Sequence, residues 1–324
     1  MSSILISAVC ALLSLALALP TAAQGFPSRP LRLMVPFAPG GPNDILGRLV
    51  AQKLHERWGQ PVVVENRGGA GGTVGLAAAA KLPSDGYHLA IAGSSNMAVA
   101  PSTYKKLPYD PVRDFTAVAM LAHVPYALAV NPVVPAKTVK ELMALARKKP
   151  GYLSYASSGM GSMSSLSAEL FKALSGADIL HVPYKGTMPA LTEVTSGQVD
   201  MMFADLSLIQ RFADAGKLRV VAAAGSKRAP AAPKVPTISE SGLKEYVVEP
   251  WFGVVAPDGV AQDIVARLNG AIVESLKAAD VSQRLAALGY EPIGGTAGDF
   301  ARTLKTDIGK YAEVVKKAGM GGKL

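Results

Sequence analysis

Two glycine-rich turns have the composition of anion-binding loops. The stretch PFAPGGPND (36–44) follows the apolar run LRLMV and leads into a helical pattern, and SSGMGS (157–162) occupies the same kind of position later in the chain. Their glycines leave main-chain N–H groups uncovered, and the positive end of a helix dipole favours a negative charge. The two turns therefore predict two halves of an anion site, although strand–glycine–helix turns also arise for purely geometric reasons.

Serine hydroxyls extend this predicted site. Ser94 and Ser95 follow a third apolar run, HLAIA, and Ser158 and Ser162 lie within the second turn. Ligands of open α/β sheets bind outside the carboxyl ends of the strands. We therefore expect a cleft with one glycine-rich sheet edge on each side.

Two acidic residues near these edges have two interpretations each. Asp44 is either a first-turn acid that complements the helix dipole or a residue that faces the cleft. In the cleft it would repel a carboxylate unless it accepted a hydrogen bond from a ligand amine, a hydroxyl or a bound water. Asp205, which ends the run VDMMFAD, is equally ambiguous.

The sequence carries no enzyme signature. It lacks G-x-S-x-G, H-E-x-x-H, C-x-x-C and a P-loop, and its four histidines are far apart, so neither a metal nor a cofactor is expected. The run GGAGGTVG fails the dinucleotide fingerprint by one residue, because Val74 occupies the position of the last glycine and Gly75 comes one residue late. A secreted hydrolase that uses Ser158 or Ser162 is the alternative, but no base lies nearby in the sequence.

Strand and helix signals alternate along the chain, which predicts an α/β fold with mainly parallel sheets. Apolar periodicity and breakers place helices at about 43–58, 138–148 and 262–277, and a last helix that opens with a capping box at 296–299. Strands are expected at 31–35, 62–64, 88–92, 127–130, 153–156, 179–182, 199–203, 218–223 and 253–255.

Two series of strand–loop–helix units predict two lobes. The last helices would pack back on the first lobe, so the chain would cross between lobes twice, near 123–126 and near 242–251. Both stretches contain proline and fit stiff hinges. The predicted boundaries are 24–124 with 249–324 for the first lobe, and 125–248 for the second.

Residues 1–23 have the features of a cleaved secretory signal peptide. They carry no charged side chain, they hold the single cysteine (Cys10), and small residues precede a cut after Ala23. The apolar run is too short for the alternative, an anchoring transmembrane helix. Export without membrane insertion suggests the bacterial periplasm. The net charge of +9 comes from scattered Lys and Arg without interleaved aromatic residues, which does not favour nucleic-acid binding.

From Pro30 onward the chain resembles the Bug-type periplasmic substrate-binding proteins of tripartite tricarboxylate transporters. The resemblance rests on VPFAPGGPND, VENRGGAGGTVG, LPYDPVRDF, SSGMGS, HVPYKG, GQVDMMF, VPTISESG and WFGVVAP. It implies a two-lobe type II periplasmic-binding fold that closes over a small carboxylate. The ligand residues that it implies are Phe37, Gly40, Gly41, Asp44, Ser94, Ser95, Ser158, Gly159, Gly161, Ser162 and Asp205.

Two positions depart from the family pattern and leave the identity of the carboxylate open. Ser165 stands where the family often has His, and Ala204 stands where it often has Asp. We expect a monomeric solute-binding protein, not an enzyme, that delivers its ligand to membrane permease subunits. A role as the input of a signalling partner is the alternative that the sequence does not separate from transport.

Overall fold

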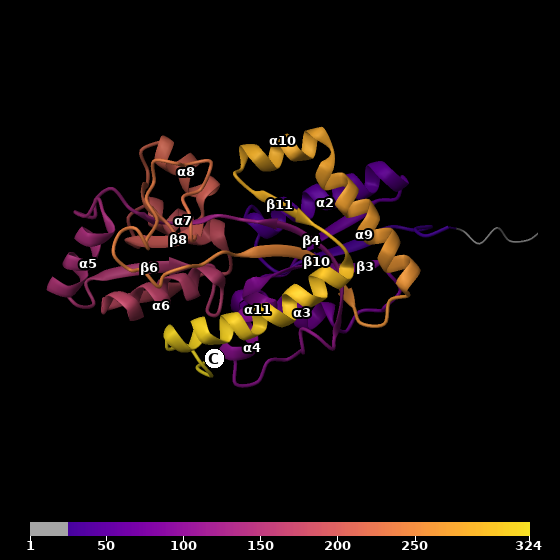
Figure 1. Cartoon of the computed structure of the whole chain (residues 1–324), viewed down its shortest axis with the longest axis horizontal. Helices are drawn as coiled ribbons and strands as arrows, with labels where there is room; N and C mark the ends of the chain where they lie inside the picture. Colours follow the sequence, from indigo (N-terminus) through magenta and orange to yellow (C-terminus); the bar gives the residue numbers. More distant parts are fainter. Residues whose placement is uncertain (1–24) are drawn as a thin grey trace, which may run out of the picture.

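The structure is a computed structural model that describes residues 25–324. The predicted signal peptide, residues 1–23, lies outside the described residues. Figure 1 shows two bodies joined by long extended segments, with the N-terminal and C-terminal parts of the chain in one body and the middle of the chain in the other.

The first body is built on a six-stranded sheet in the order β11-β4-β10-β3-β1-β2. β1 pairs in parallel with β2 and β3, whereas β10 runs antiparallel to both β3 and β4, and β11 runs antiparallel to β4. The strands are β1 (Leu31–Val35), β2 (Val62–Asn66), β3 (His88–Gly93), β4 (Phe115–His123), β10 (Trp251–Pro257) and β11 (Glu291–Gly294).

The second body is built on a five-stranded sheet in the order β7-β6-β8-β5-β9. β6 is parallel to β7 and β8, and β5 is antiparallel to β8 and β9. The strands are β5 (Tyr126–Val130), β6 (Leu153–Ser157), β7 (Ile179–Pro183), β8 (Met201–Asp205) and β9 (Arg219–Ala223).

Helices flank the two sheets (Figure 1). Those of the first body are α2 (Pro42–Trp58), η1 (Ala70–Gly72), α3 (Thr73–Ala79), η2 (Ser95–Val99), α4 (Ala100–Thr103), α9 (Gln262–Lys277), α10 (Ala279–Ala287) and α11 (Ala297–Lys317). Those of the second are α5 (Val139–Lys148), α6 (Met163–Ser175), α7 (Thr187–Thr195) and α8 (Leu206–Asp214). α11 also reaches the second body, where it packs against α6.

The sheets are mixed, so the expectation of mainly parallel sheets is wrong. For β5 and β10 the cause is the double crossing between the bodies. β1, β3, β6 and β8 all end at the edge where the bodies meet, whereas β5 and β10 enter their sheets from that edge. A strand that starts where its neighbours end must run antiparallel to them.

The predicted crossings match the structure, and the domain boundaries stay a prediction. The chain leaves β4 at His123 and begins β5 at Tyr126, and it returns through residues 248–250 into β10. Which residues move together as one lobe is a separate question from which sheet they join. The boundaries 24–124 with 249–324, and 125–248, therefore stay a prediction about rigid units.

Local signals located most of the elements. The capping box at the start of α11 is confirmed, since Thr296 accepts from the Asp299 N–H and Asp299 accepts from the Thr296 N–H. β4, β11, α7, α8 and α10 were not predicted.

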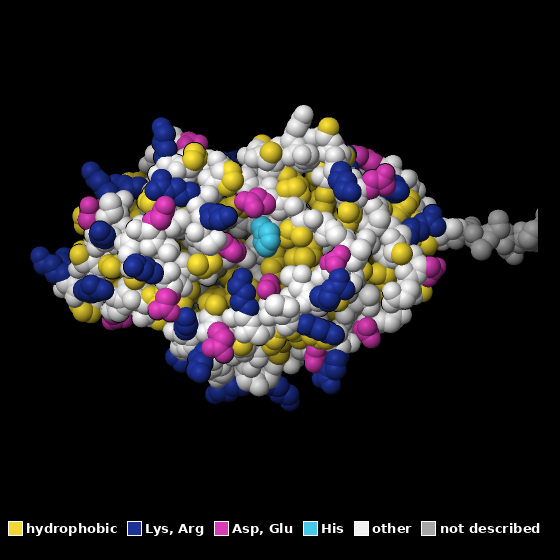
Figure 2. All heavy atoms as spheres, in the orientation of Figure 1, with side chains coloured by type: hydrophobic (Ala, Val, Ile, Leu, Met, Phe, Trp, Pro, Cys, Tyr) yellow, Lys and Arg dark blue, Asp and Glu magenta, His cyan; other side chains and the backbone are white. Residues whose placement is uncertain are grey.

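Charged side chains of both signs are mixed over the surface. Lys and Arg alternate with Asp and Glu across the face in Figure 2, which agrees with the scattered basic residues of the sequence. Among the described residues, no helix is both long and apolar enough to cross a membrane.

A close approach at Gly253 fixes α11 on the first sheet. Trp251 and Phe300 pack edge to face with ring centroids 5.3 Å apart, and the Trp251 Nε1–H donates to Asp307 Oδ2 at 2.6 Å. A Cβ atom on Gly253 would lie 2.7 Å from Phe300 Cζ and 2.9 Å from the Ala119 carbonyl oxygen. The bare backbone of β10 is therefore part of this packing.

We predict that Gly253→Ala lowers the free energy of unfolding by roughly 1–3 kcal/mol, the usual cost of overpacking a core. Urea unfolding followed by circular dichroism measures it. The control is Gly270→Ala at an exposed position of α9, where nothing lies within 4 Å of an added Cβ atom and alanine should stabilise by about 1 kcal/mol. Equal effects of the two substitutions would contradict the close-packing explanation.

Candidate functional site

The two glycine-rich turns lie at the junction of the two bodies and contact the opposite body through main-chain atoms. The β1–α2 turn meets the start of α7, where the Ala38 N–H donates to the Lys185 carbonyl at 3.4 Å. A Cβ atom on Gly71 would lie 2.7 Å from the Met160 carbonyl oxygen and 2.9 Å from the Ser162 nitrogen. A side chain larger than hydrogen at Gly71 would hold the two bodies apart at this contact.

A small cavity lies between the bodies and is called the interlobe cavity here. Its volume is about 10 Å³, which is room for about one water molecule. Admission of a carboxylate therefore requires the two bodies to move apart. The cavity is lined by Phe37, Asn43, Ser94, Ser95, Tyr126, Ser158, Met163, Thr187, Pro250 and Phe252.

Four of the predicted ligand residues line this cavity, namely Phe37, Ser94, Ser95 and Ser158. The others do not: Gly40, Gly41, Asp44, Gly159, Gly161, Ser162 and Asp205. The sequence reasoning missed Asn43, Tyr126, Met163, Thr187, Pro250 and Phe252. Asn43 lies inside the quoted PGGPND motif, and Tyr126 and Pro250 lie in the two predicted crossings, so those segments carried a signal that was not used.

The interlobe cavity is polar without being charged. None of the residues that line it is Asp, Glu, Lys, Arg or His. Three helices begin there, because Asn43, Met163 and Thr187 stand in the first turns of α2, α6 and α7. Hydroxyls, one carboxamide and helix N-termini favour an anion held by dipoles and hydrogen bonds.

Asp44 organises the first turn from within its own body. Its carboxylate accepts from the Gly40 N–H at 3.0 Å, from Arg48 Nε at 2.9 Å and from Asn66 Nδ2 at 2.9 Å. Burial alone would raise the pKa of Asp44, but these hydrogen bonds and the Arg48 charge outweigh it and hold the pKa below its usual range. The Gly40 N–H group, which the sequence analysis assigned to an anion site, therefore donates its hydrogen bond to Asp44.

The second turn is organised by a hydroxyl that the sequence analysis did not single out. Ser164 Oγ lies 3.0 Å from Ser158 Oγ and 2.9 Å from Ser162 Oγ, and it accepts from the Ser158 N–H at 2.8 Å. Ser162 caps α6 by accepting from the Ser165 N–H. The α6 N-terminus therefore carries a connected set of hydroxyls.

The histidine nearest this turn does not activate the serines that a hydrolase would use. His181 Nε2 lies 2.6 Å from Ser157 Oγ, and Ser157 is fully buried. Burial lowers the pKa of His181 to about 4, so the ring is neutral at pH 7. Within residues 25–324 no cluster of His, Cys, Asp and Glu is suited to a metal ion.

Asp205 lies beside the crossing rather than on the interlobe cavity. It is the N-cap of α8, where Oδ1 accepts from the Ser207 N–H at 2.8 Å, and Oδ2 accepts from the Tyr290 hydroxyl of the other body. Its cross-strand partner is Tyr126, which does line the cavity. Burial raises the pKa of Asp205 to about 6 despite these hydrogen bonds.

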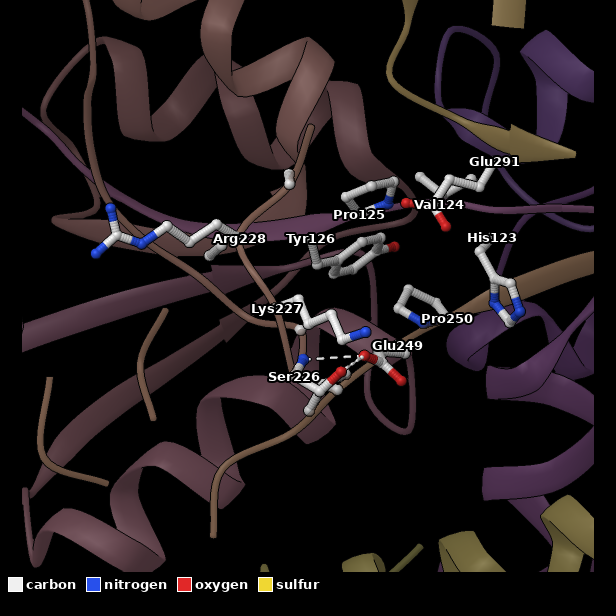
Figure 3. Close-up of a pocket in the computed structure, with 14 residues that line it drawn as sticks. His123, Val124, Pro125, Tyr126, Ser226, Lys227, Arg228, Glu249, Pro250 and Glu291 are labelled. Carbon is white, nitrogen blue, oxygen red and sulfur yellow. Dashed lines mark hydrogen bonds between the residues drawn. The ribbon is translucent and has the colours of Figure 1, made fainter. Parts of the chain in front are cut away.

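A second hollow, the hinge groove, adjoins the two crossing segments (Figure 3). Its volume is about 310 Å³, and it is lined by residues 123–126, 223, 225–229, 248–250 and 291. Glu249 accepts from the Ser226 N–H at 2.9 Å and from Ser226 Oγ at 2.5 Å. Tyr126 and Pro250 line both hollows, so movement of the crossings would change both.

Comparison with known proteins identifies this arrangement. The model of the tripartite tricarboxylate transporter family receptor, TctC, matches residues 46–320. The chain belongs to the TctC family. BugT of Bordetella pertussis is 36% identical over 304 residues, which cover 94% of this chain and 93% of BugT.

Solved TctC-like structures agree with the family assignment. An R. palustris protein solved with adipate has a TM-score of 0.88 and 37% identity, covering 91% of this chain and 98% of its own. MatC from Rhodopseudomonas palustris with bound malate has a TM-score of 0.86 and 34% identity, covering 90% and 100%. This chain is a TctC-family periplasmic solute-binding protein with a two-lobe α/β fold, rather than an enzyme.

We predict that Asp205 contributes a measurable pH dependence to stability. Its folded pKa of about 6 lies above the value of about 3.9 for an unfolded Asp. Between these values the folded state binds more protons, so stability falls as pH rises from about 4 to about 6. The full difference is on the order of 2–3 kcal/mol at about 1.4 kcal/mol per pKa unit.

Asp205→Asn should remove this decline, because the amide oxygen still accepts from Ser207 and has no charge to bury. Urea unfolding at pH 4.5 and pH 7 measures the difference for each protein. Asp178→Asn, at an exposed position, is the control and should follow the parent chain. An Asp205→Asn protein with the parent's pH dependence would exclude this origin.

Proposed function

We propose that this TctC protein captures a small organic carboxylate by closure of its two lobes and delivers it to the membrane permease subunits of a tripartite transporter. The observation that carries the proposal is the interlobe cavity, where uncharged hydrogen-bonding groups and three helix N-termini meet. The relatives solved with adipate and malate support a carboxylate ligand. We further propose that residues 1–23 are a cleaved signal peptide and that the mature chain is a monomer.

The proposed site has an inner and an outer part. The inner part touches the ligand and consists of Phe37, Asn43, Ser94, Ser95, Tyr126, Ser158 and Thr187. The outer part shapes the two turns and consists of Gly40, Gly41, Asp44, Gly159, Gly161, Ser162 and Ser164. Asp205 contributes indirectly, because it is the cross-strand partner of Tyr126.

Closure supplies the affinity in this proposal. Hydrogen bonds to a charged group contribute about 1.5–3 kcal/mol each, and micromolar binding requires about 8 kcal/mol. Donors from one lobe alone supply only part of this binding free energy. Groups such as Ser158 and Thr187 on the second lobe and Ser94 and Ser95 on the first are needed together, so the closed arrangement is favoured when the ligand is present.

A thermal-shift panel tests the ligand class. We expect at least one of adipate, malate, citrate and nicotinate to raise the melting temperature, with glucose and spermidine as neutral and cationic controls. A ligand at 100 times its dissociation constant should stabilise the protein by about 2.7 kcal/mol. Stabilisation by glucose or spermidine, with none by any of the four acids, would overturn the proposal.

Lobe closure is tested by a pair of glycine substitutions. Gly71 and Gly59 both have positive φ, +63° and +69°, so alanine strains the backbone equally at the two positions. Only a Cβ atom on Gly71 meets the opposite lobe, because nothing lies within 4 Å of one on Gly59.

We expect both Gly71→Ala and Gly59→Ala to lower stability by about 1–2 kcal/mol and only Gly71→Ala to weaken the best acid of the panel, by about tenfold or more. Calorimetric titration measures the affinities, and small-angle scattering with ligand should show a more open Gly71→Ala protein. Unchanged affinity in Gly71→Ala would contradict binding by closure at this contact.

A further inference from the structure

The side-chain carbonyl oxygen of Asn43 is buried and accepts no hydrogen bond within residues 25–324. Asn43 is 6% exposed and lines the interlobe cavity from the first turn of α2. The great majority of buried polar side-chain atoms have a partner. An acceptor without one, at the cavity of a binding protein, indicates where a ligand donor is placed.

The rest of the first turn explains why no protein group fills this role. The neighbouring donors are already used: the Gly40 N–H and Asn66 Nδ2 both serve Asp44. Pro42, directly before Asn43, has no N–H to offer, and no side chain caps the helix at Gly41. The acceptor is therefore built into the wall of the interlobe cavity.

Charge decides which donor fits. A carboxylate is an acceptor only and cannot satisfy the Asn43 oxygen. An ammonium group could donate, but the residues that line the cavity include no acid to balance a desolvated positive charge. A hydroxyl group donates without adding charge, so it meets the requirement of both the oxygen and the uncharged cavity.

We propose that Asn43 is a specificity-determining residue that accepts a hydrogen bond from a ligand hydroxyl, so that the protein selects hydroxylated carboxylates over their unhydroxylated analogues. This inference rests on the carboxylate-binding function proposed above and names the subclass of acid. A ligand without the hydroxyl leaves the oxygen unpaired when the lobes close over it, which lowers its affinity.

Matched acids test the proposal by calorimetric titration. The pairs are succinate and malate, adipate and 2-hydroxyadipate, and tricarballylate and citrate, which differ by one hydroxyl, with aspartate as the amino counterpart of malate. For the chain length that binds best, we expect the hydroxy acid to bind about tenfold tighter or more. For the four-carbon acids, malate should also bind tighter than aspartate.

Variants assign the preference to Asn43. Asn43→Ala should bring the ratio of affinities within the best pair close to one, while Gln198→Ala, which removes an exposed carboxamide that does not line the cavity, should keep the parent ratio. Asn43→Asp places a charged acceptor at the same point and should favour aspartate over malate. Circular dichroism and urea unfolding verify that each variant is folded.

Three results would overturn the inference. Equal affinity of the parent protein for both members of the best pair would do so without any variant. An equal loss for both members in Asn43→Ala would mean that the amide nitrogen serves the carboxylate instead. Binding of none of the seven acids would remove the inference, and it would remove the proposed function as well if nicotinate also failed to bind, whereas the first two results leave carboxylate binding intact.

Discussion

At the glycine-rich turns the two lobes meet through main-chain atoms, and this close approach is the constraint on which the site depends. At Gly71 the neighbour across the junction is a peptide group of the SSGMGS turn, at less than the distance that a methyl group needs. At Gly159 the neighbour is the Gly71 nitrogen, and at Gly186 it is the methyl group and the main-chain nitrogen of Ala38. These close contacts at glycines bring three helix N-termini around the interlobe cavity, whose lining residues carry no charge.

The sequence predicted the binding edges better than the interlobe cavity. Both glycine-rich turns were identified because turn chemistry is local, and the structure brings them to one junction. Tyr126 and Thr187 were missed because a single polar residue in an extended segment or at a helix start becomes part of a site only through the tertiary arrangement. The two crossings were predicted from the two series of strand–helix units and the return of the last helices to the first lobe, but what their side chains face depends on how the lobes close.

The missed strands have physical reasons of a different kind. β4, FTAVAMLAH, is an apolar run rich in alanine without period-two alternation, which does not distinguish a strand from a buried helix. β11 contains Pro292 and lies at the edge of its sheet, where proline is tolerated although it weakens the strand signal. The antiparallel direction of β5 and β10 follows from the path of the whole chain, so no local sequence pattern predicts it.

The two ambiguous acids resolve into opposite electrostatic roles. Asp44 is stabilised as a carboxylate by Arg48 and by donors from its own turn, and it keeps the turn in shape. Asp205 is buried with neutral partners, among them the Tyr290 hydroxyl of the other lobe.

The central position of β10 in the first sheet affects the order in which the two sheets can be completed during synthesis. The second sheet is complete once Ala223 has been synthesised, whereas the first stays split between β3 and β4 until β10 is made. A chain that emerges from its N-terminus therefore holds β4 apart from the paired strands β1, β2 and β3 of its first lobe, while the inserted lobe already has every strand of its sheet.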